Sequence, residues 1–486
     1  MKRLTLFSAL VASVFFIAGC SSVVRLVRGP SSLERFQDNL DALLSDSIFS
    51  ATKCGIEIIS LGNGETLYER DADMLLRPAS NMKLLTTSAA LSLLGKQFSL
   101  NTRLYADTLI TDSVEHGNIY IKGYGDPDFN SAQLQELLST IRTRGIKRIE
   151  GNIIGDAGYF DNRNWGVGWM WDDEPFGFAA YNSPLSINRN CVEVTVNPGV
   201  MPGDSARVAI DPPTRYVSVE NHATTAMDTI PGSIEISRKF AEKLNVITVN
   251  GAIPRNATPQ KDLITVLNPE LYFLTLAQEE LGRQHIEFSG KLLLDSVRHN
   301  AVLLAQHVQP IDSMMTYLNK VSDNLSAENT LKILGAEQYG VPGTTQHGIW
   351  AVNRFLNNVG VDTSKFLMVD GSGVSHYNLL TPNIYIKLLR GMYSRKDVFD
   401  LFYSTLPNAG VDGSLETRMK NTPAQNNLHA KTGTISGVSS LAGYVRTADG
   451  EVLAFSMMMQ NYIGSSEPYR KTQDAIGVLM AGFRRE

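Results

Sequence analysis

The sequence predicts an α/β (α+β) protein in which the two ends of the chain surround a large strand-rich insertion. The first part of the chain has the order helix, strand, strand, and the last part has the order strand, strand, helix. Between about residues 96 and 299 the pattern changes to short strand-like runs separated by Gly, Pro, Asn and Asp. The insertion is therefore expected to be a separate module.

The first predicted element is a helix that begins near residue 32. Ser31-Ser32-Leu33-Glu34 has the spacing of a capping box, and apolar residues then recur at helical spacing. A strand-like run from Cys54 to Leu61 precedes Gly62-Asn63-Gly64, which is a hairpin turn signal. A long apolar helix is then expected from about Ser80 to Leu94, with Gly95 as its C-cap.

The later elements follow from the same patterns. One helix, from Ser131 to Arg144, interrupts the strand-rich segment. A helical pattern returns from about Ile311 to Leu334. Near the C-terminus two strand-like runs flank Asp449-Gly450, a strong hairpin signal. An amphipathic helix from about Glu467 to Phe483 ends the chain.

The composition suits a globular protein of two or more domains and excludes some functions. The chain has 486 residues, a formal net charge of -5 and 43% hydrophobic residues. This mildly acidic balance gives no basic field, so no nucleic-acid partner is expected. The histidines form no metal-spaced cluster and C-x-x-C is absent from the sequence, so we expect no metal and no cofactor. Cys54 and Cys191 either form a bridge in an oxidising compartment or remain buried thiols.

The N-terminus has the features of a secretory signal. Two basic residues precede an apolar run from Leu4 to Ala18, which is shorter than the roughly 20 residues of a spanning helix. Cys20 follows Ile17-Ala18-Gly19, and this arrangement resembles a bacterial lipobox. The resemblance implies a lipoprotein signal peptide at 1–19 and a lipid anchor at Cys20. The protein would then be exported and anchored on the periplasmic side of the envelope, at the outer membrane in a Gram-negative cell. The alternative is an ordinary signal peptide with an incidental cysteine.

The first motif with catalytic potential is Ser80-Asn81-Met82-Lys83. A serine and a lysine three residues apart on a helix stand on one face. A hydroxyl is a weak nucleophile until a base takes its proton, and lysine is such a base when desolvation or a nearby cation lowers its pKa. At the helix N-terminus, the backbone N–H of Ser80 can face a developing oxyanion. The alternative is an ordinary helix start with Lys83 on the solvent face.

The second motif is Ser322-Asp323-Asn324, which lies between two helical stretches. A hydroxyl and a carboxamide two residues apart in a loop can point into one cleft. Because Ser, Asp and Asn are turn formers, the alternative is a solvated turn between helices.

The third motif is Lys431-Thr432-Gly433-Thr434, just before the C-terminal hairpin. The lysine supplies a positive charge beside hydroxyl donors, and the glycine lets a substrate backbone approach closely. The group suits a strand edge that binds a substrate carboxylate and aligns its peptide as an added strand. The alternative is a surface strand that begins with a loop lysine.

Together the three motifs have the order S-x-x-K, S-x-N, K-T-G, the signature of penicillin-recognising serine enzymes. The sequence resembles the class C low-molecular-mass penicillin-binding proteins, the D-alanyl-D-alanine carboxypeptidase/endopeptidase family. The long separation of Ser80 from Ser322 and the segment Asp370-Gly371-Ser372-Gly373-Val374-Ser375 are similar to that family. The resemblance implies a penicillin-binding-protein/β-lactamase-like transpeptidase domain, an antiparallel sheet flanked by helices, at 32–95 plus 300–486. The insertion would span 96–299.

The resemblance also implies a mechanism that passes through an acyl-enzyme on Ser80. The substrates would be peptidoglycan stem peptides, and β-lactam antibiotics would be covalent inhibitors. Lys83 would accept the Ser80 proton, and Ser322 would relay a proton to the leaving D-Ala. Asn324 would bond the peptide amide, and Lys431 would supply positive potential. The implied oxyanion donors are the backbone N–H groups of Ser80 and Thr434.

Further residues are implied to bind substrate. Thr432 and Thr434, on either side of Gly433, would bind the terminal carboxylate. Asp173 and Phe178 would bind the amino end of a diaminoacid in the peptide, and the alternative is a loop with a solvated acid and a packed ring. His376 stands where many relatives have an arginine, which leaves side-chain recognition open.

Two other functions compete with this prediction. A β-lactamase would need an efficient deacylating base, and the sequence shows no clear one. A non-catalytic β-lactam-sensing or wall-binding lipoprotein would be favoured by loss of Ser80, Lys83 or Lys431, yet all three are present. The sequence does not distinguish carboxypeptidase from endopeptidase action.

Overall fold

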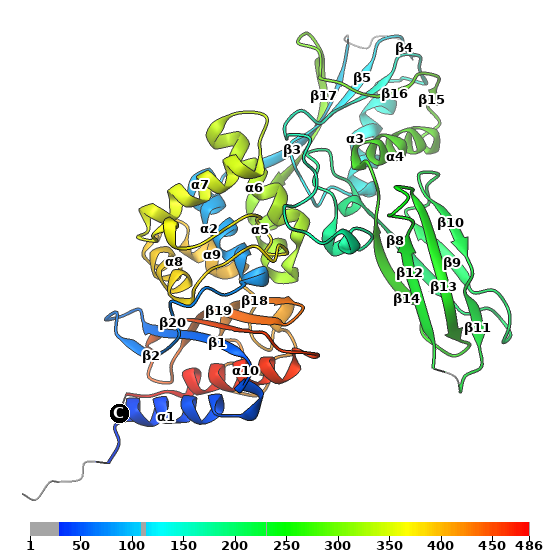
Figure 1. Cartoon of the computed structure of the whole chain (residues 1–486). Coiled ribbons are helices and arrows are strands. Elements are labelled where there is room, and N and C mark those ends of the chain that lie inside the picture. The colour runs from blue at the N-terminus through cyan, green and yellow to red at the C-terminus, as the bar shows by residue number, and fades with distance from the viewer. Residues whose placement is uncertain (1–28, 108–112, 230, 486) are drawn as a thin grey trace, which may run out of the picture.

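The computed structural model of the protein describes residues 29–107, 113–229 and 231–485. The predicted signal peptide at 1–19 and the predicted anchor Cys20 lie outside the described residues. Figure 1 shows a sheet and its helices, formed by the two ends of the chain, beside a strand-rich part formed by the middle. We call residues 29–98 and 311–485 the catalytic region and residues 99–310 the inserted region.

The catalytic region is built on one five-stranded antiparallel sheet with the order β18-β19-β20-β1-β2. Strand β1 pairs with β20, so the first strand of the chain is joined directly to the last. The five strands are β1 (Lys53–Ser60), β2 (Thr66–Arg70), β18 (His429–Ile435), β19 (Val438–Arg446) and β20 (Val452–Gln460). In this strand order β18 lies at one edge of the sheet.

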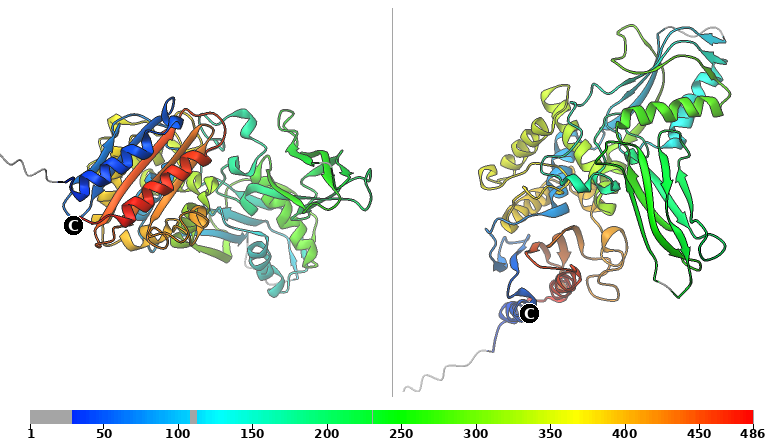
Figure 2. Two further views of the ribbon diagram at one scale, coloured as in Figure 1. Left: turned by 90° about the horizontal axis from the view of Figure 1, so that it is seen from below. Right: turned by 45° about the vertical axis from the view of Figure 1, so that its right-hand side comes forward.

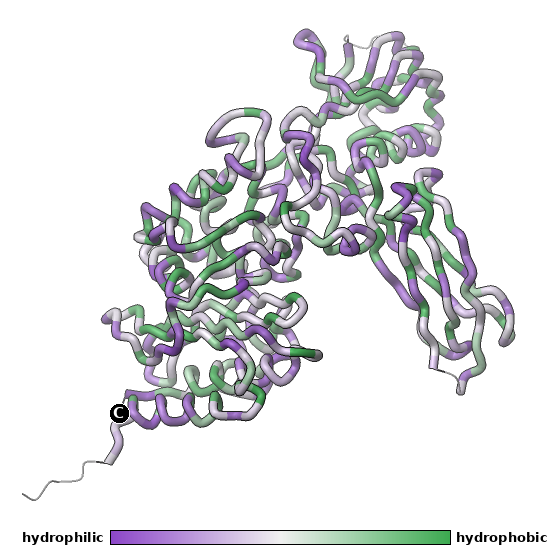
Figure 3. Tube along the Cα trace, in the orientation of Figure 1, coloured by the Kyte–Doolittle hydropathy of each residue, from purple (hydrophilic) through white to green (hydrophobic). Residues whose placement is uncertain are grey.

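Helices cover both faces of this sheet, which explains why β19 and β20 are buried almost along their whole length. On one face, α1 (Ser32–Leu44) and α10 (Glu467–Gly482) lie side by side, as Figure 2 shows. The predicted capping box of α1 is present, with Ser31 Oγ accepting from the Glu34 N–H. In Figure 3, α1 alternates hydrophilic and hydrophobic colours along its turns, as expected for a helix with one buried face.

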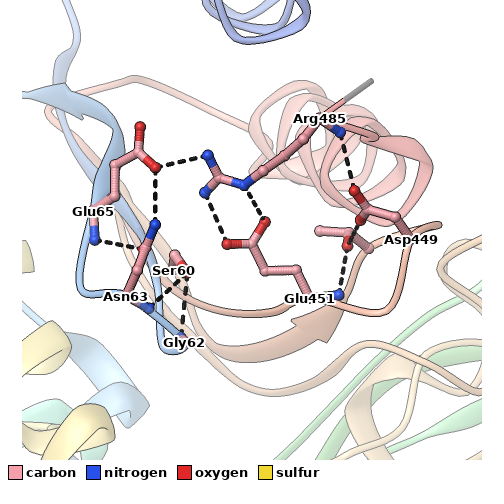
Figure 4. A network of polar contacts seen from close by, with 8 residues as sticks. Ser60, Gly62, Asn63, Glu65, Asp449, Glu451 and Arg485 are labelled. Atoms are coloured by element: carbon pink, nitrogen blue, oxygen red, sulfur yellow. Dashed lines mark hydrogen bonds and ion pairs between the residues drawn. The ribbon is translucent and has the colours of Figure 1, made fainter.

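The two ends of the chain are also tied by ion pairs near the hairpin turns of this sheet (Figure 4). The Arg485 guanidinium lies 2.7 Å from a carboxylate oxygen of Glu65, in the first hairpin. It also donates two hydrogen bonds to Glu451, beside the last hairpin. The backbone N–H of Arg485 donates to Asp449. These contacts join the C-terminal tail to both hairpins.

The opposite face of the sheet carries a layer of helices, in which α2 and α6 are buried over most of their length. Helix α2 packs against α6 and α7, and α8 packs against β1 and β20. Ser322 ends a π-helical turn, Leu318–Ser322, that connects α5 to α6. The helices of this layer are α2 (Met82–Leu94), α5 (Ile311–Tyr317), α6 (Asn324–Tyr339), α7 (Thr345–Asn358), α8 (Pro382–Ser394) and α9 (Phe399–Thr405).

The inserted region consists of two strand-rich parts. In the first, a five-stranded sheet has the order β16-β7-β5-β3-β17 and packs against α3 and α4. The predicted boundary at residue 299 falls just before β17, which pairs antiparallel with β3. The elements of this part are β3 (Ser99–Ala106), β4 (Val114–Glu115), β5 (Ile119–Gly123), α3 (Ser131–Thr143), β6 (Arg148–Ile149), β7 (Ile153–Asp156), α4 (Pro269–Arg283), β15 (Glu287–Phe288), β16 (Leu292–Leu294) and β17 (Val302–Pro310).

The second part contains two small sheets, seen at the lower right of Figure 1. One sheet has the order β14-β8-β9, and the other joins β10, β11 and β12 to β13. The strands are β8 (Cys191–Asn197), β9 (Arg207–Asp211), β10 (Ser218–Asn221), β11 (Thr224–Ala226), β12 (Ser233–Arg238), β13 (Val246–Pro254) and β14 (Gln260–Thr265). Cys191, at the start of β8, and Cys54, on β1, are both buried free thiols. Of the two alternatives for these cysteines, the structure therefore has the unpaired thiols.

Candidate active site

Ser80 and Lys83 stand together at the start of α2, as their spacing predicts. Ser80 lies in a short 3-10 turn, Ala79–Asn81, that leads into the helix. The Lys83 side chain is fully buried, and its Nζ lies 2.9 Å from Ser80 Oγ. A solvent-facing lysine, the alternative that the motif left open, is therefore excluded.

Two further oxygens fix the direction of the Lys83 amine. Nζ donates to Asn324 Oδ1 at 2.6 Å and to the Ser372 carbonyl at 2.8 Å. Both are carbonyl oxygens that only accept, so each takes one N–H of the amine. The remaining position of the nitrogen is directed at Ser80 Oγ. In the neutral amine this position is a lone pair, which is able to take the hydroxyl proton.

The surroundings of Lys83 favour that neutral form. Burial lowers the pKa of Lys83 from its usual value to about 8, and the carboxylates of Asp323, Asp370 and Glu328 limit the decrease. A general base works best when its pKa lies near the working pH. The site therefore holds a lysine suited to activating the Ser80 hydroxyl.

Two glycines allow neighbouring segments to pack closely on the Ser80 turn. A Cβ on Gly373, at φ +86°, would lie 1.8 Å from the Ala79 carbonyl oxygen. A Cβ on Gly433 would lie 2.7 Å from the Pro78 carbonyl oxygen. Only glycine fits at these approaches. The 370–375 segment and the edge strand β18 are thereby held against the Ser80 turn.

The second and third motifs meet each other beside the first. Lys431 Nζ donates to Ser322 Oγ at 2.8 Å and is fully buried on β18. Burial holds the pKa of Lys431 well below its usual range, and the positive charge of Lys83 adds to this effect. Ser322 has a positive φ of 67°, which is uncommon for a residue with a side chain. Strained residues of this kind persist where the surrounding structure holds them and are common at active sites.

These groups open onto a cavity of about 400 Å³. Seven of the residues singled out from the sequence line it, whereas Lys83 and Lys431 lie beneath and contact the lining serines. The lining residues are Ser80, Met170, Asp173, Phe178, Ser322, Asn324, Gly373, Val374, His376, Thr434, Ile435 and Ser436. Among the described residues, no group of three or more His, Cys, Asp or Glu side chains is arranged to hold a metal ion.

Of the residues implied to bind the substrate carboxylate, Thr434 lines the cavity and Thr432 does not. The Thr432 hydroxyl lies 2.7 Å from the Ser414 hydroxyl. Both threonines stand on the same face of β18, because alternate residues of a strand share a face. Strand β18 is at the sheet edge, so an extended peptide is able to pair with it.

The three remaining candidates form one wall of the cavity. The Asp173 carboxylate accepts from the Met170 N–H at 3.2 Å, and burial raises its pKa. Phe178 is 49% exposed, and its ring stacks on Phe176 with the centroids 6.1 Å apart. Its carbonyl oxygen accepts from Asn324 Nδ2 at 2.7 Å, which joins this wall to the second motif.

His376 differs from the other wall residues because an arginine lies behind it. Arg77 Nη1 is 3.1 Å from His376 Nδ1. Burial lowers the pKa of His376, and the Arg77 charge lowers it further. The guanidinium only donates, so Nδ1 accepts and the ring hydrogen lies on Nε2.

Several residues at the site were missed by sequence reasoning. Arg189, from the inserted region, contacts the carboxylates of Asp128 and Asp323, and its guanidinium lies 4.4 Å from the Tyr317 ring centroid. Glu328 bonds two backbone N–H groups of the 370–375 segment. A charged residue four positions after Asn324, in an otherwise buried helix, was a signal that could have identified Glu328.

A model of the D-Ala-D-Ala carboxypeptidase 3 (S13) family matches residues 36–482. The chain belongs to this family. It is 32% identical over 466 residues to a D-alanyl-D-alanine carboxypeptidase of Actinomadura sp. (strain R39), covering 93% of this chain and 85% of the relative. It is 28% identical to the D-alanyl-D-alanine carboxypeptidase DacB of Haemophilus influenzae, covering 86% of this chain and 88% of the relative.

Solved structures agree with the S13 assignment. Penicillin-binding protein 4 of Haemophilus influenzae superposes with a TM-score of 0.82 at 26% identity, covering 92% of this chain and all of that chain. The same protein complexed with a β-lactam gives a TM-score of 0.75 at 26% identity, covering 90% of this chain and 98% of that chain. The resemblance to class C low-mass penicillin-binding proteins and the α+β fold are thus confirmed.

Proposed function

We propose that this S13 protein is a serine-type D-Ala-D-Ala carboxypeptidase, endopeptidase or both, acting on peptidoglycan stem peptides. The observation that carries the proposal is the 2.9 Å contact between Ser80 Oγ and a buried lysine whose other two bonds are used by carbonyl oxygens. The curated relatives named carboxypeptidases support the same activity. β-Lactams are expected to acylate the same serine, and the β-lactam complex of the Haemophilus protein supports this.

In the proposed acylation step, Ser80 Oγ attacks the carbonyl carbon of the penultimate D-Ala. Lys83 takes the hydroxyl proton, and the backbone N–H groups of Ser80 and Thr434 stabilise the oxyanion. The peptide C–N bond then breaks, and the leaving nitrogen receives a proton through Ser322, which is hydrogen-bonded to Lys431. The products of this step are an ester on Ser80 and a free amine.

Hydrolysis of the acyl-enzyme then completes the reaction, and the amine that left during acylation defines the type of activity. A water molecule attacks the ester carbonyl and releases the shortened peptide, which regenerates the Ser80 hydroxyl. A free terminal D-Ala as the leaving amine defines carboxypeptidase action. The side-chain amine of a neighbouring stem peptide as the leaving group defines endopeptidase action.

We also propose that the protein is exported and lipid-anchored at Cys20. The basic residues, the apolar run and the lipobox-like Ile17-Ala18-Gly19-Cys20 support this location. Among the described residues, no helix combines the length and the apolar character needed to cross a bilayer. Mass spectrometry of the mature N-terminus tests the anchor, because an N-terminal diacylglyceryl cysteine is expected at residue 20. An unmodified N-terminus would contradict it.

Digestion of defined cell-wall peptides tests the activity. A pentapeptide ending in D-Ala-D-Ala and a cross-linked dimer are each incubated with the protein, and the products are weighed by mass spectrometry. Loss of one D-Ala indicates carboxypeptidase action, and separation of the dimer indicates endopeptidase action. Ser80→Ala is expected to abolish both. Ser88→Ala is the matched control, because Ser88 lies further along α2 and its hydroxyl has no partner among the described residues. Intact substrates after incubation with the wild-type protein would contradict the proposal.

A further inference from the structure

We propose that Glu328, a buried residue of α6, is a positioning residue that sets both the direction and the protonation of Lys83 through the 371–372 backbone. This inference rests on the proposed function, because it concerns the base that would activate Ser80. Glu328 does not contact the cavity and therefore acts through other residues.

The direction of Lys83 depends on Glu328 through a single intermediate residue. Glu328 Oε1 accepts from the Gly371 N–H at 3.0 Å and from the Ser372 N–H at 2.8 Å. The carbonyl of the same Ser372 accepts from Lys83 Nζ at 2.8 Å. Holding the amide group on one side of Ser372 therefore fixes the carbonyl on its other side.

Helix α6 thus controls both carbonyl oxygens that orient the amine. Asn324, in its first turn, contacts Lys83 directly. Glu328 lies four residues later, on the same face of the helix, and acts through Ser372. Once the bonds from Lys83 Nζ to Asn324 and Ser372 are set, the remaining position of the nitrogen points toward Ser80 Oγ.

Asp370 is a second buried carboxylate near Lys83, and its hydrogen bonds hold the loop that follows it. It accepts from Asn378 Nδ2 at 2.7 Å and from Trp169 Nε1 at 3.0 Å. It also accepts from the backbone N–H groups of Gly373 and Ser375. Four donors saturate this carboxylate and fix the shape of the loop. Glu328 is left as the acid whose charge is least compensated, because it has two backbone donors and the Ser372 hydroxyl.

The charges around Glu328 couple its protonation to that of Lys83. Burial and the Asp370 charge together raise the pKa of Glu328 to about 8, against the opposing effects of the Ser372 hydrogen bonds and the Lys83 charge. Glu328 therefore gains its charge over the same pH range in which Lys83 loses its proton. The negative charge of Glu328 in turn raises the pKa of Lys83, together with the charges of Asp323 and Asp370. Two other lysines also belong to this group, since Lys332 interacts with Glu328 and Lys431 with Lys83. Loss of the Glu328 charge is therefore expected to lower the pKa of Lys83.

The test is the pH profile of Ser80 acylation by a fluorescent penicillin, measured as a second-order rate constant. In Glu328→Gln the side-chain oxygen still accepts from the two backbone N–H groups, but the charge is gone. We expect the acidic limb of the profile to move to lower pH by up to about one pH unit, because Glu328 is only partly charged where Lys83 titrates. Ser372→Ala removes only the hydroxyl bonded to Glu328, keeps the carbonyl at Lys83, and is expected to move the limb the same way by less.

Glu337→Gln is the matched control, since Glu337 is also on α6 and accepts from Tyr159 Oη, away from Lys83. Its profile is expected to match that of the wild-type protein. An unchanged limb in both Glu328→Gln and Ser372→Ala would overturn the inference, and the second variant decides the question if the first does not fold. A wild-type protein that is not labelled at all would instead contradict the proposed function.

Discussion

Buried cations have different partners at the active-site cavity and in the inserted region. In the inserted region, the fully buried Arg238 has a carboxylate partner, Glu174, at 2.9 Å. Beneath the active-site cavity, Lys83 and Lys431 are both fully buried, and neither forms an ion pair with any described residue. Their amines face hydroxyl and carbonyl oxygens instead.

This difference separates charges that support the fold from charges that support chemistry. A buried cation without a counter-ion is costly, and its pKa falls because burial disfavours the charged form. Such groups gather at active sites, where a shifted pKa is useful. The two buried lysines without an ion-pair partner therefore identify the active site better than the shape of the cavity does.

The largest effect is expected from replacing an unpaired buried lysine. Lys83→Gln removes the base, so the rate of acylation by a β-lactam is expected to fall about 1,000-fold. Its melting temperature should be unchanged or higher, because the lowered pKa of Lys83 shows that the cost of burying its charge outweighs the attraction of the nearby carboxylates. Lys332→Gln is the matched contrast, since Lys332 is also buried but is paired with Asp161 at 2.6 Å. That variant should lose stability, and its acylation rate should change far less than that of Lys83→Gln. A large loss of stability in Lys83→Gln would show that the Lys83 charge supports the fold.

The pH dependence of acylation is the next effect in size. Only the neutral amine of Lys83 accepts a proton, and its pKa is about 8. The neutral fraction, and with it the rate, is expected to rise about 100-fold between pH 6 and pH 9 and to level off above that. Stopped-flow acylation over this range checks the prediction. A rate that falls as the pH rises through 8 would show that Lys83 is not the base.

A smaller effect is expected where the two regions meet. Arg189 reaches from the inserted region to Asp323, between Ser322 and Asn324. Arg189→Leu should displace this loop and slow acylation about tenfold or more, because small misplacements of reacting groups are costly. Arg207→Leu is the control, as Arg207 is exposed on β9 and donates only to the Pro198 carbonyl among the described residues. Equal rates in the two variants would show that the inserted region does not position the site.

The smallest effect is expected for exposed ion pairs of the inserted region. Lys239 and Glu220 lie 2.7 Å apart, with side chains 32% and 44% exposed. Lys239→Ala should change the free energy of unfolding by less than about 1 kcal/mol and leave acylation unchanged. Chemical denaturation measures the first quantity. A loss of several kcal/mol would show that surface charge contributes more than this comparison assumes.

The sequence predicted the parts of the site that depend on local geometry. The spacing of Ser80 and Lys83 placed them on one face of a helix, and their contact follows from helical geometry alone. The family resemblance, rather than spacing, brought Ser322 and Lys431 to the same place. Glu328 and Arg189 were missed because their roles depend on contacts between segments far apart in the chain. The boundary at 299 was placed before β17 because the pairing of β17 with β3 is also a long-range contact.

The position of a bound β-lactam shows directly whether Ser80 is the nucleophile. The protein is labelled with benzylpenicillin, denatured and digested, and the modified peptide is sequenced by mass spectrometry. We predict one penicilloyl group, on the Ser80 hydroxyl, and none in Ser80→Ala. A label on Ser322 or another residue, or its persistence in Ser80→Ala, would contradict the account.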